Sequence, residues 1–176
     1  MNNTYPVSAR VKQVFVISLV CTIVWMMLMG SAIKPLNSKQ IVAFELAKTA
    51  EAAAKISKEW EEKDLIPNAK KSIYLDFVFL ILYSVSIGIG CIVLSAFTGN
   101  SFLVRIGLML SKIVPFAGLF DVVENLAMLK TLSGEITMLT VAIAFWFAIL
   151  KFLIVILSLL FVIGCMIFWR IKRFYK

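Results

Sequence analysis

The chain has 176 residues, of which 61% are hydrophobic, and its mean hydropathy is +0.96. Soluble domains average roughly 45–50% apolar residues, so this composition is that of a membrane protein, without room for a separate soluble domain. Histidine is absent, which excludes Ser-His-Asp chemistry, the usual haem ligation and zinc sites built from histidine. The formal net charge of +8 indicates topology signals and contact with anionic headgroups, not nucleic acid.

Four apolar runs are long enough to cross a bilayer, which takes about 20 residues. They cover residues 11–33, 73–97, 102–132 and 138–169. The last run is over-long, so it should tilt or project beyond the membrane. We therefore predict an all-α, polytopic membrane protein in which residues 1–176 form a single domain, a bundle of four transmembrane helices. Trp146 is expected to pack inside this bundle.

The polar segment between the first two runs, residues 37–66, is predicted to hold one amphipathic helix from about Ser38 to Lys63. Asn37 offers an N-cap and Gln40 follows three residues later, as in a capping box. One helical face then carries a stripe made of Val42, Leu46, Thr49, Ala53, Ile56 and Trp60. This stripe favours a helix that lies on its own protein or on headgroups. The alternative is a surface for docking or dimerisation, formed by Val42, Leu46, Ile56 and Trp60.

Basic residues favour a cytoplasmic location for both termini. An even number of spans puts the two ends on one side, and a dense basic cluster follows the last span directly. The first loop carries about as many basic residues as the side of the termini, so the counts alone do not fix the orientation. The prediction therefore depends on the dense cluster that adjoins the membrane. We expect an integral protein of the plasma or inner membrane, with anionic headgroups as one partner and a second copy or another membrane protein as a further one. The first run is also compatible with a cleaved signal peptide, because Gly30, Ser31 and Ala32 are small.

The third run contains the segment PFAGLFDVVENLAM, with two carboxylates and an amide in an otherwise apolar stretch. Acidic side chains at membrane depth are costly and rarely face lipid. We counted depth at 1.5 Å per residue from the side of the first loop. Asp76, Glu124, Asp121 and Lys151 then lie about 5, 10, 15 and 20 Å deep. These groups should therefore meet inside the bundle.

The expected polar pocket is formed by Asp76, Tyr83, Asp121, Glu124, Asn125 and Lys151. One lysine cannot neutralise three acids, so at least one carboxyl should be protonated, bind a cation or touch water. This predicts a site that binds or passes a small solute, a proton or cation, or a lipid.

Two alternatives stay open. In the first, the buried charges only hold the helices in register, and the chain is a non-catalytic accessory or interaction subunit of a membrane complex. In the second, the chain is a membrane enzyme that acts on a lipid, with a carboxylate as general base. The sequence offers no nucleophile or electrophile in a recognisable setting, so no catalytic residue and no cofactor is assigned. The three cysteines lie in separate apolar runs and indicate core packing rather than a metal site.

Overall fold

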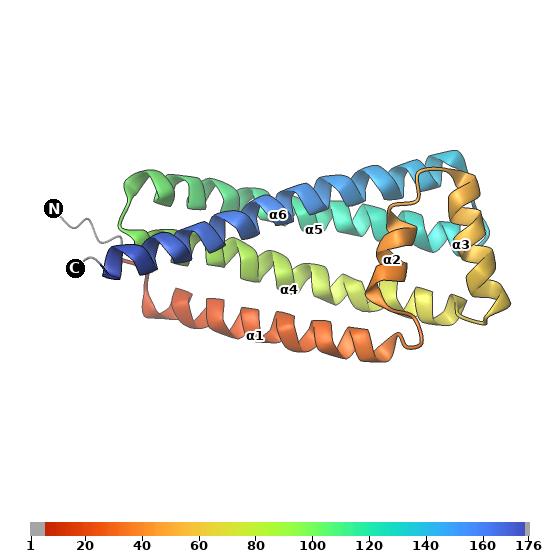
Figure 1. Ribbon diagram of the computed structural model, residues 1–176, viewed down its shortest axis with the longest axis horizontal. Coiled ribbons are helices and arrows are strands. Elements are labelled where there is room, and N and C mark those ends of the chain that lie inside the picture. Colours follow the sequence, from red (N-terminus) through yellow and green to blue (C-terminus); the bar gives the residue numbers. More distant parts are fainter. Residues whose placement is uncertain (1–5, 175–176) are drawn as a thin grey trace. The chain divides into compact units, whose positions relative to one another are not determined.

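The computed structural model describes residues 6–174, and these residues form six helices. In chain order the helices are α1 (Ala9–Ala32), α2 (Ser38–Glu45), α3 (Ala50–Glu62), α4 (Ile66–Thr98), α5 (Ser101–Thr131) and α6 (Met138–Phe174). The helices α1, α4, α5 and α6 are long and apolar enough to cross a membrane. The two short helices lie between the first two of these spans (Figure 1). The prediction of an all-α protein with four spans and a helical first loop is confirmed.

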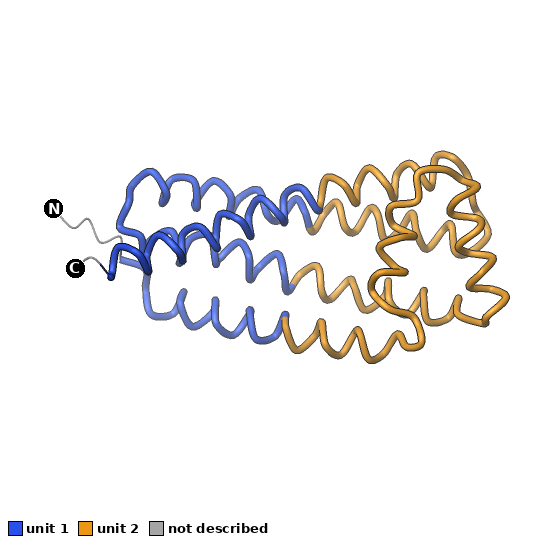
Figure 2. The backbone as a smooth tube through the Cα atoms, in the orientation of Figure 1, with its two compact units in different colours: residues 1–22, 82–117, 152–176 blue, residues 23–81, 118–151 orange. Residues whose placement is uncertain are grey.

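The chain divides into two compact units (Figure 2). The first unit comprises residues 1–22, 82–117 and 152–176, and the second comprises residues 23–81 and 118–151. Each long helix contributes one segment to each unit, whereas α2 and α3 belong entirely to the second unit. The single domain expected from the sequence stays a prediction.

The start of α2 has the predicted capping box. The side chain of Asn37 accepts a hydrogen bond from the amide of Gln40 at 3.1 Å, and the side chain of Gln40 accepts one from the amide of Asn37 at 3.1 Å. Both bonds satisfy amides that have no partner within the helix.

The single helix predicted for the first loop is wrong, because the chain forms two helices there. The first ends at Glu45, and the next begins after Thr49. The hydroxyl of Thr49 accepts a hydrogen bond from the amide of Ala52 at 3.2 Å, which makes Thr49 an N-cap rather than a member of a continuous stripe. The stripe from Val42 to Trp60 is thus divided between two helices.

The second span begins earlier than predicted, at Ile66 rather than at residue 73. Pro67 occupies the first turn of α4. Proline is well tolerated there because its missing N–H would have had no partner within the helix. The helix α4 therefore begins with two polar turns on the side of the loop, and its apolar run follows them.

The second unit contains a hydrophobic core that the loop helices help to close. Phe44 of α2 and Trp60 of α3 are buried, with ring centroids 5.1 Å apart. The long helices supply Ala69, Ile73, Ala127, Met128, Leu132, Val141 and Ala144 to this core. Ile56 packs against the same core. Trp60 and Ile56 are thus engaged within the chain, and partner docking through this surface stays a prediction.

Two side-chain hydrogen bonds fix the end of α1 within the second unit. The indole nitrogen of Trp25 donates to the carbonyl oxygen of Leu75 in α4 at 3.0 Å. The amide of Asn68, at the start of α4, donates to the carbonyl oxygen of Lys34 at 2.7 Å. These bonds position the chain where it leaves α1 and enters α2.

Small residues let helices approach closely within the first unit. A Cβ atom on Gly107 of α5 would lie 2.5 Å from the carbonyl oxygen of Cys91 in α4, and it would also meet the hydroxyl of Ser95. A Cβ atom on Gly90 of α4 would lie 2.9 Å from the ring of Phe15 in α1. Glycine is therefore required at position 107, where backbone stands in the way, whereas at position 90 a shift of the Phe15 ring would make room for a Cβ atom.

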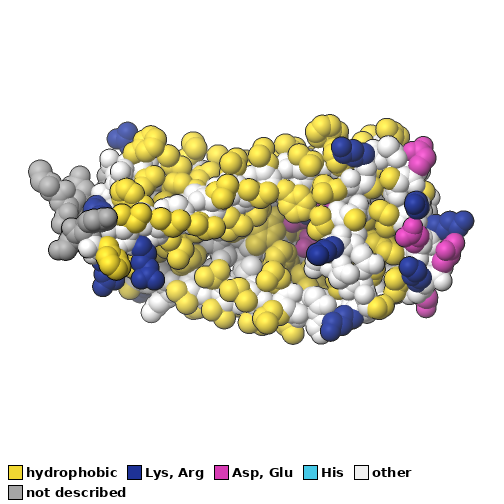
Figure 3. Space-filling model, in the orientation of Figure 1, with side chains coloured by type: hydrophobic (Ala, Val, Ile, Leu, Met, Phe, Trp, Pro, Cys, Tyr) yellow, Lys and Arg dark blue, Asp and Glu magenta, His cyan; other side chains and the backbone are white. Residues whose placement is uncertain are grey.

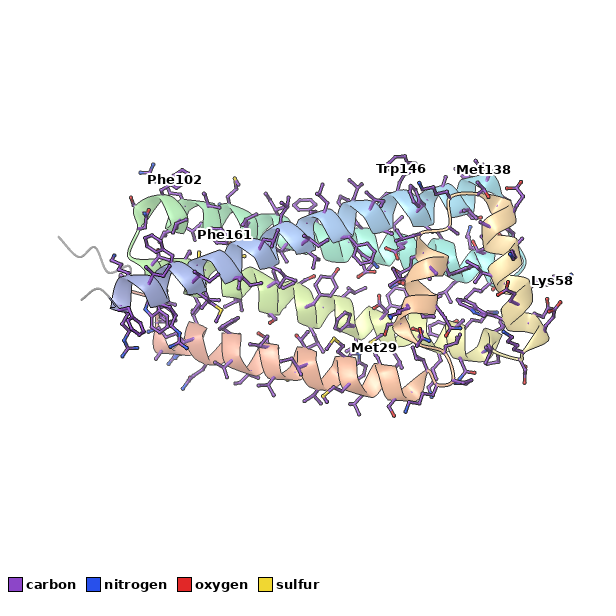
Figure 4. The ribbon with its side chains drawn as sticks, viewed as in Figure 1. Met29, Lys58, Phe102, Met138, Trp146 and Phe161 are labelled. Atoms are coloured by element: carbon purple, nitrogen blue, oxygen red, sulfur yellow. The ribbon has the colours of Figure 1, made fainter. Side chains whose placement is uncertain are left out.

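Much of the apolar side-chain surface of the spans is exposed, as expected for helices that face lipid. Only 6% of the most apolar window of α1 and 11% of that of α6 are buried. Met138 and Trp146 project outward from α6 (Figure 4), and the side chain of Trp146 is largely exposed. The expectation that Trp146 packs inside is wrong. A large indole gains as much from hydrocarbon as from a protein core, so hydropathy alone does not tell the two surroundings apart.

Candidate functional site

The second unit holds a buried ammonium group between carboxylates. Lys151 of α6 is 7% exposed, and its Nζ donates to Asp121 Oδ1 at 2.7 Å and to Glu124 Oε1 at 2.9 Å. Both acids come from α5, where a spacing of three residues places them on one helical face. Asp121 is 2% exposed, and Glu124 is completely buried. The structure thus brings together the three charged residues that the sequence placed at similar depth.

A third carboxyl at this site comes from the first loop. Glu45 is the last residue of α2, and its Oε2 lies 3.7 Å from Lys151 Nζ. Glu45 is buried, and this burial raises the pKa of its carboxyl, although the lysine acts in the opposite direction. The side chains of Lys151, Glu45, Asp121 and Glu124 are called the Lys151 cluster below.

Sequence reasoning missed Glu45 because the apolar stripe pointed to other residues of the loop. A usable signal was present. Glu45 is the only charged residue in the apolar segment IVAFELA, and it shares a helical face with Ile41 and Phe44. Both of these are buried in the core, so the carboxyl beside them is carried inward as well.

A second polar contact links α4 to α5 in the same unit. The side-chain amide of Asn125 donates to Asp76 Oδ2 at 2.8 Å. Asn125 is buried, whereas Asp76 is only partly buried. The predicted residues Asp76 and Asn125 therefore form a pair of their own, one residue along α5 from Glu124. Tyr83 is buried in the first unit, and its predicted place in the pocket stays a prediction.

The Lys151 cluster has more carboxyl groups than one lysine can neutralise. The carboxyls of Glu45 and Glu124 both approach the same ammonium, because Lys151 Nζ lies 3.7 Å from Glu45 Oε2 and 2.9 Å from Glu124 Oε2. An ionised carboxylate only accepts hydrogen bonds, so a carboxyl can donate to a neighbouring oxygen only if it carries a proton. Glu45 Oε2 and Glu124 Oε2 are both buried without a hydrogen-bond partner, although Glu124 Oε2 lies 2.9 Å from the lysine nitrogen. Protonation of one carboxyl removes this defect.

The site is shielded from its surroundings, because Glu124, Asp121 and Lys151 are only 0%, 2% and 7% exposed. In the part of the chain that the structure describes, no group of three or more His, Cys, Asp or Glu residues is arranged to hold a metal ion. The chemistry that the arrangement offers is therefore that of carboxyl groups and an ammonium, which exchange protons and form ion pairs.

The four long apolar helices define the class of the protein, which is that of polytopic integral membrane proteins. Its spans also carry a buried lysine and buried carboxylates. No protein family, no curated protein and no solved structure matches the chain.

Proposed function

We propose that the protein binds and releases a proton at the Lys151 cluster, and that this step accompanies the binding or passage of a cation or another small solute in the membrane. The observation that carries the proposal is a single ammonium within 4 Å of three carboxyl groups, at distances of 2.7, 2.9 and 3.7 Å.

The charge balance supports a proton. Carboxylates that share a buried site cannot all be ionised, because like charges in a medium of low dielectric constant repel strongly. Lys151 compensates one of the three negative charges, and a proton between Glu45 and Glu124 removes a second. The protonation of a carboxyl that is kept neutral by its neighbours changes when their position or charge changes. Ionisable groups at such positions in membrane proteins commonly mark proton and ion pathways.

The origin of Glu45 suggests how the site opens. Glu45 belongs to an eight-residue helix outside the four spans, while the other members of the cluster lie on α5 and α6. The contact between Phe44 and Trp60 joins α2 to α3. A displacement of α2 would remove one carboxyl from the cluster without moving a span. The remaining groups would then reach the aqueous side of the first loop.

The test compares two amide variants inside the cluster with one outside it. Glu45→Gln and Glu124→Gln each replace a group that can share the proton, and Glu59→Gln replaces an exposed acid on α3. Proton uptake between two pH values is measured on each purified protein, together with the infrared band of protonated carboxyls. We expect both cluster variants to lose this band and to take up about one proton fewer, while Glu59→Gln behaves as the wild type. Uptake and spectra that are identical in all four proteins would contradict the proposal.

A second candidate function is an accessory subunit in which these charges are structural. It is favoured by the connections of Lys151, which joins α6 to α5 through two hydrogen bonds and to α2 through an ion pair. The double variant Asp121→Asn with Glu124→Gln distinguishes the two functions. Normal folded yield with lost proton uptake favours the proton site. Lost folded yield, together with normal uptake in Glu45→Gln, favours the structural role.

A further inference from the structure

The formal net charge of the chain is concentrated in one unit. The sequence of the first unit contains eight Lys and Arg residues and no Asp or Glu. The second unit contains ten lysines and ten acids, so its formal charge is zero. The whole net charge of +8 therefore belongs to the first unit. The unit therefore offers its cations no Asp or Glu side chain as a partner.

Two of these cations lie over a pair of aromatic rings. Phe97, near the end of α4, and Trp169, near the end of α6, have ring centroids 6.1 Å apart. The Nζ of Lys12 lies 5.3 Å from the centroid of the Phe97 ring, and the guanidinium carbon of Arg173 lies 5.6 Å from that of the Trp169 ring. Cations at such distances are attracted by the face of the ring. The contacts gather residues from α1, α4 and α6 at one place.

A third cation closes the end of α4 beside this pair. Lys172 donates from Nζ to the carbonyl oxygen of Thr98 at 3.0 Å. Thr98 is the last residue of the helix, and Gly99 follows it with a φ of 64°, the left-handed conformation that commonly ends a helix. A lysine there satisfies a carbonyl without an intrahelical partner. Lys172 thus has a structural role in addition to its charge.

We propose that this cluster of Lys12, Lys172 and Arg173 around Phe97 and Trp169 binds the phosphate headgroup of an anionic phospholipid. The proposal does not depend on the proton site, because it concerns the other unit.

The chemistry of the cluster matches both parts of such a lipid. Its cations are positively charged and attract phosphate, and no Asp or Glu side chain of the unit competes with the phosphate for them. Its aromatic rings are of the kind found at headgroup level. Exposed apolar side chains adjoin it directly, including Ile171 and Phe174 of α6. Figure 3 shows the same adjacency, because basic side chains gather beside hydrophobic ones at the end of this unit. A ligand that covers both surfaces needs a negative headgroup and an acyl chain.

The experiment measures the binding of phosphatidylglycerol and of phosphatidylcholine to the whole protein in neutral detergent, by native mass spectrometry or by fluorescence from labelled lipid. The test variant is Lys12→Gln with Arg173→Gln, which leaves the Lys172 cap in place. The control variant is Lys39→Gln with Lys63→Gln, two exposed lysines of the second unit. A further variant, Lys12→Arg with Arg173→Lys, retains the charge.

We expect the wild type to prefer phosphatidylglycerol, and this preference to decrease with salt. The test variant should bind phosphatidylglycerol roughly twenty-five-fold more weakly, about fivefold for each cation removed, with little change for phosphatidylcholine. The control and the charge-retaining variants should bind as the wild type does. Equal affinity of the wild type for the two lipids, or an equal loss in the control variant, would overturn the proposal.

Discussion

Replacing Lys151 by methionine tests whether the cluster depends on its one cation. Methionine has a similar length and an apolar end, so it fills the space of the lysine stem and removes only the charge. The substitution leaves Asp121 and Glu124 buried without the group that donates a hydrogen bond to each of them. We expect the protein to fold less stably at neutral pH, and we expect the deficit to shrink as the carboxyls become protonated at lower pH.

The magnitude follows from the two hydrogen bonds. A bond to a charged group contributes about 1.5–3 kcal/mol. Two such bonds correspond to roughly 3–6 kcal/mol. The usual cost of removing one partner from a buried ion pair is about 3–5 kcal/mol, which lies in the same range. The matched control is Lys58→Met on α3. Lys58 is paired with Glu62 at 4.0 Å, and their side chains are 77% and 64% exposed. An exposed pair of this kind is worth about 0.3–0.5 kcal/mol.

The assay is reversible unfolding of the purified protein in mixed micelles, with helix content followed at several pH values. A second variant combines Lys151→Met with Asp121→Asn and Glu124→Gln. It should recover much of the lost free energy of unfolding, because a buried site without charges has nothing left to compensate. The reasoning is refuted if Lys151→Met unfolds within about 1 kcal/mol of the wild type at neutral pH. A deficit that stays constant with pH, or that the neutral triple variant does not reduce, would refute it as well.

Three further predictions concern other parts of the chain. Gly107→Ala should destabilise the protein by about 1–3 kcal/mol, because the added Cβ would overlap α4. The control Gly164→Ala should not destabilise it, because a Cβ there meets nothing within 4 Å. Equal unfolding free energies of the two variants would disprove the close approach at Gly107. Burial raises the pKa of Glu45, so the folded state holds this proton more tightly than the unfolded chain does. The stability from Glu45 is then complete below the ordinary carboxyl pKa and is lost as pH rises through the raised value. Proteolysis of the first loop should accordingly increase with pH in the wild type and not in Glu45→Gln, and equal pH profiles would count against this sign. Finally, a reporter enzyme that works only in the cytoplasm should be active when it is fused to the C-terminus, and one that works only outside the cytoplasm should be inactive there. The opposite pattern would contradict the predicted cytoplasmic location of the termini.

Much of the fold and three of the four members of the Lys151 cluster follow from local periodicity. Four apolar runs fix four spans, and helical spacing with a constant rise per residue brings Asp121, Glu124 and Lys151 to one level. These rules apply inside a regular helix. They do not say where a loop folds back, which is why Glu45 was missed.

The errors have a common cause, since they arise where tertiary contacts or caps override a pattern. Leu46 continues the apolar spacing of the first loop, but the hydroxyl of Thr49 starts a new helix and divides the stripe. Trp146 has the hydropathy of a core residue, yet its side chain is 61% exposed on α6. In a membrane protein, the hydropathy of a residue indicates whether its side chain lies in an apolar environment or in water. It does not indicate whether that apolar environment is lipid or the protein interior.

The hydrogen bonds from Lys151 to α5 also constrain how the chain enters the bilayer during synthesis. α5 has the lowest hydropathy of the four spans, 1.8 against 2.9 for α6. Each unpaired Asp or Lys near the centre of a span costs about 2.5–3.5 kcal/mol on insertion. The ribosome produces both acids of α5 before the lysine that forms hydrogen bonds with them. A helical hairpin that enters as one piece presents these charges to the lipid already joined. We therefore expect the third span to depend on the fourth for its integration into the membrane, so that the order in which the helices leave the translocon influences how the site forms.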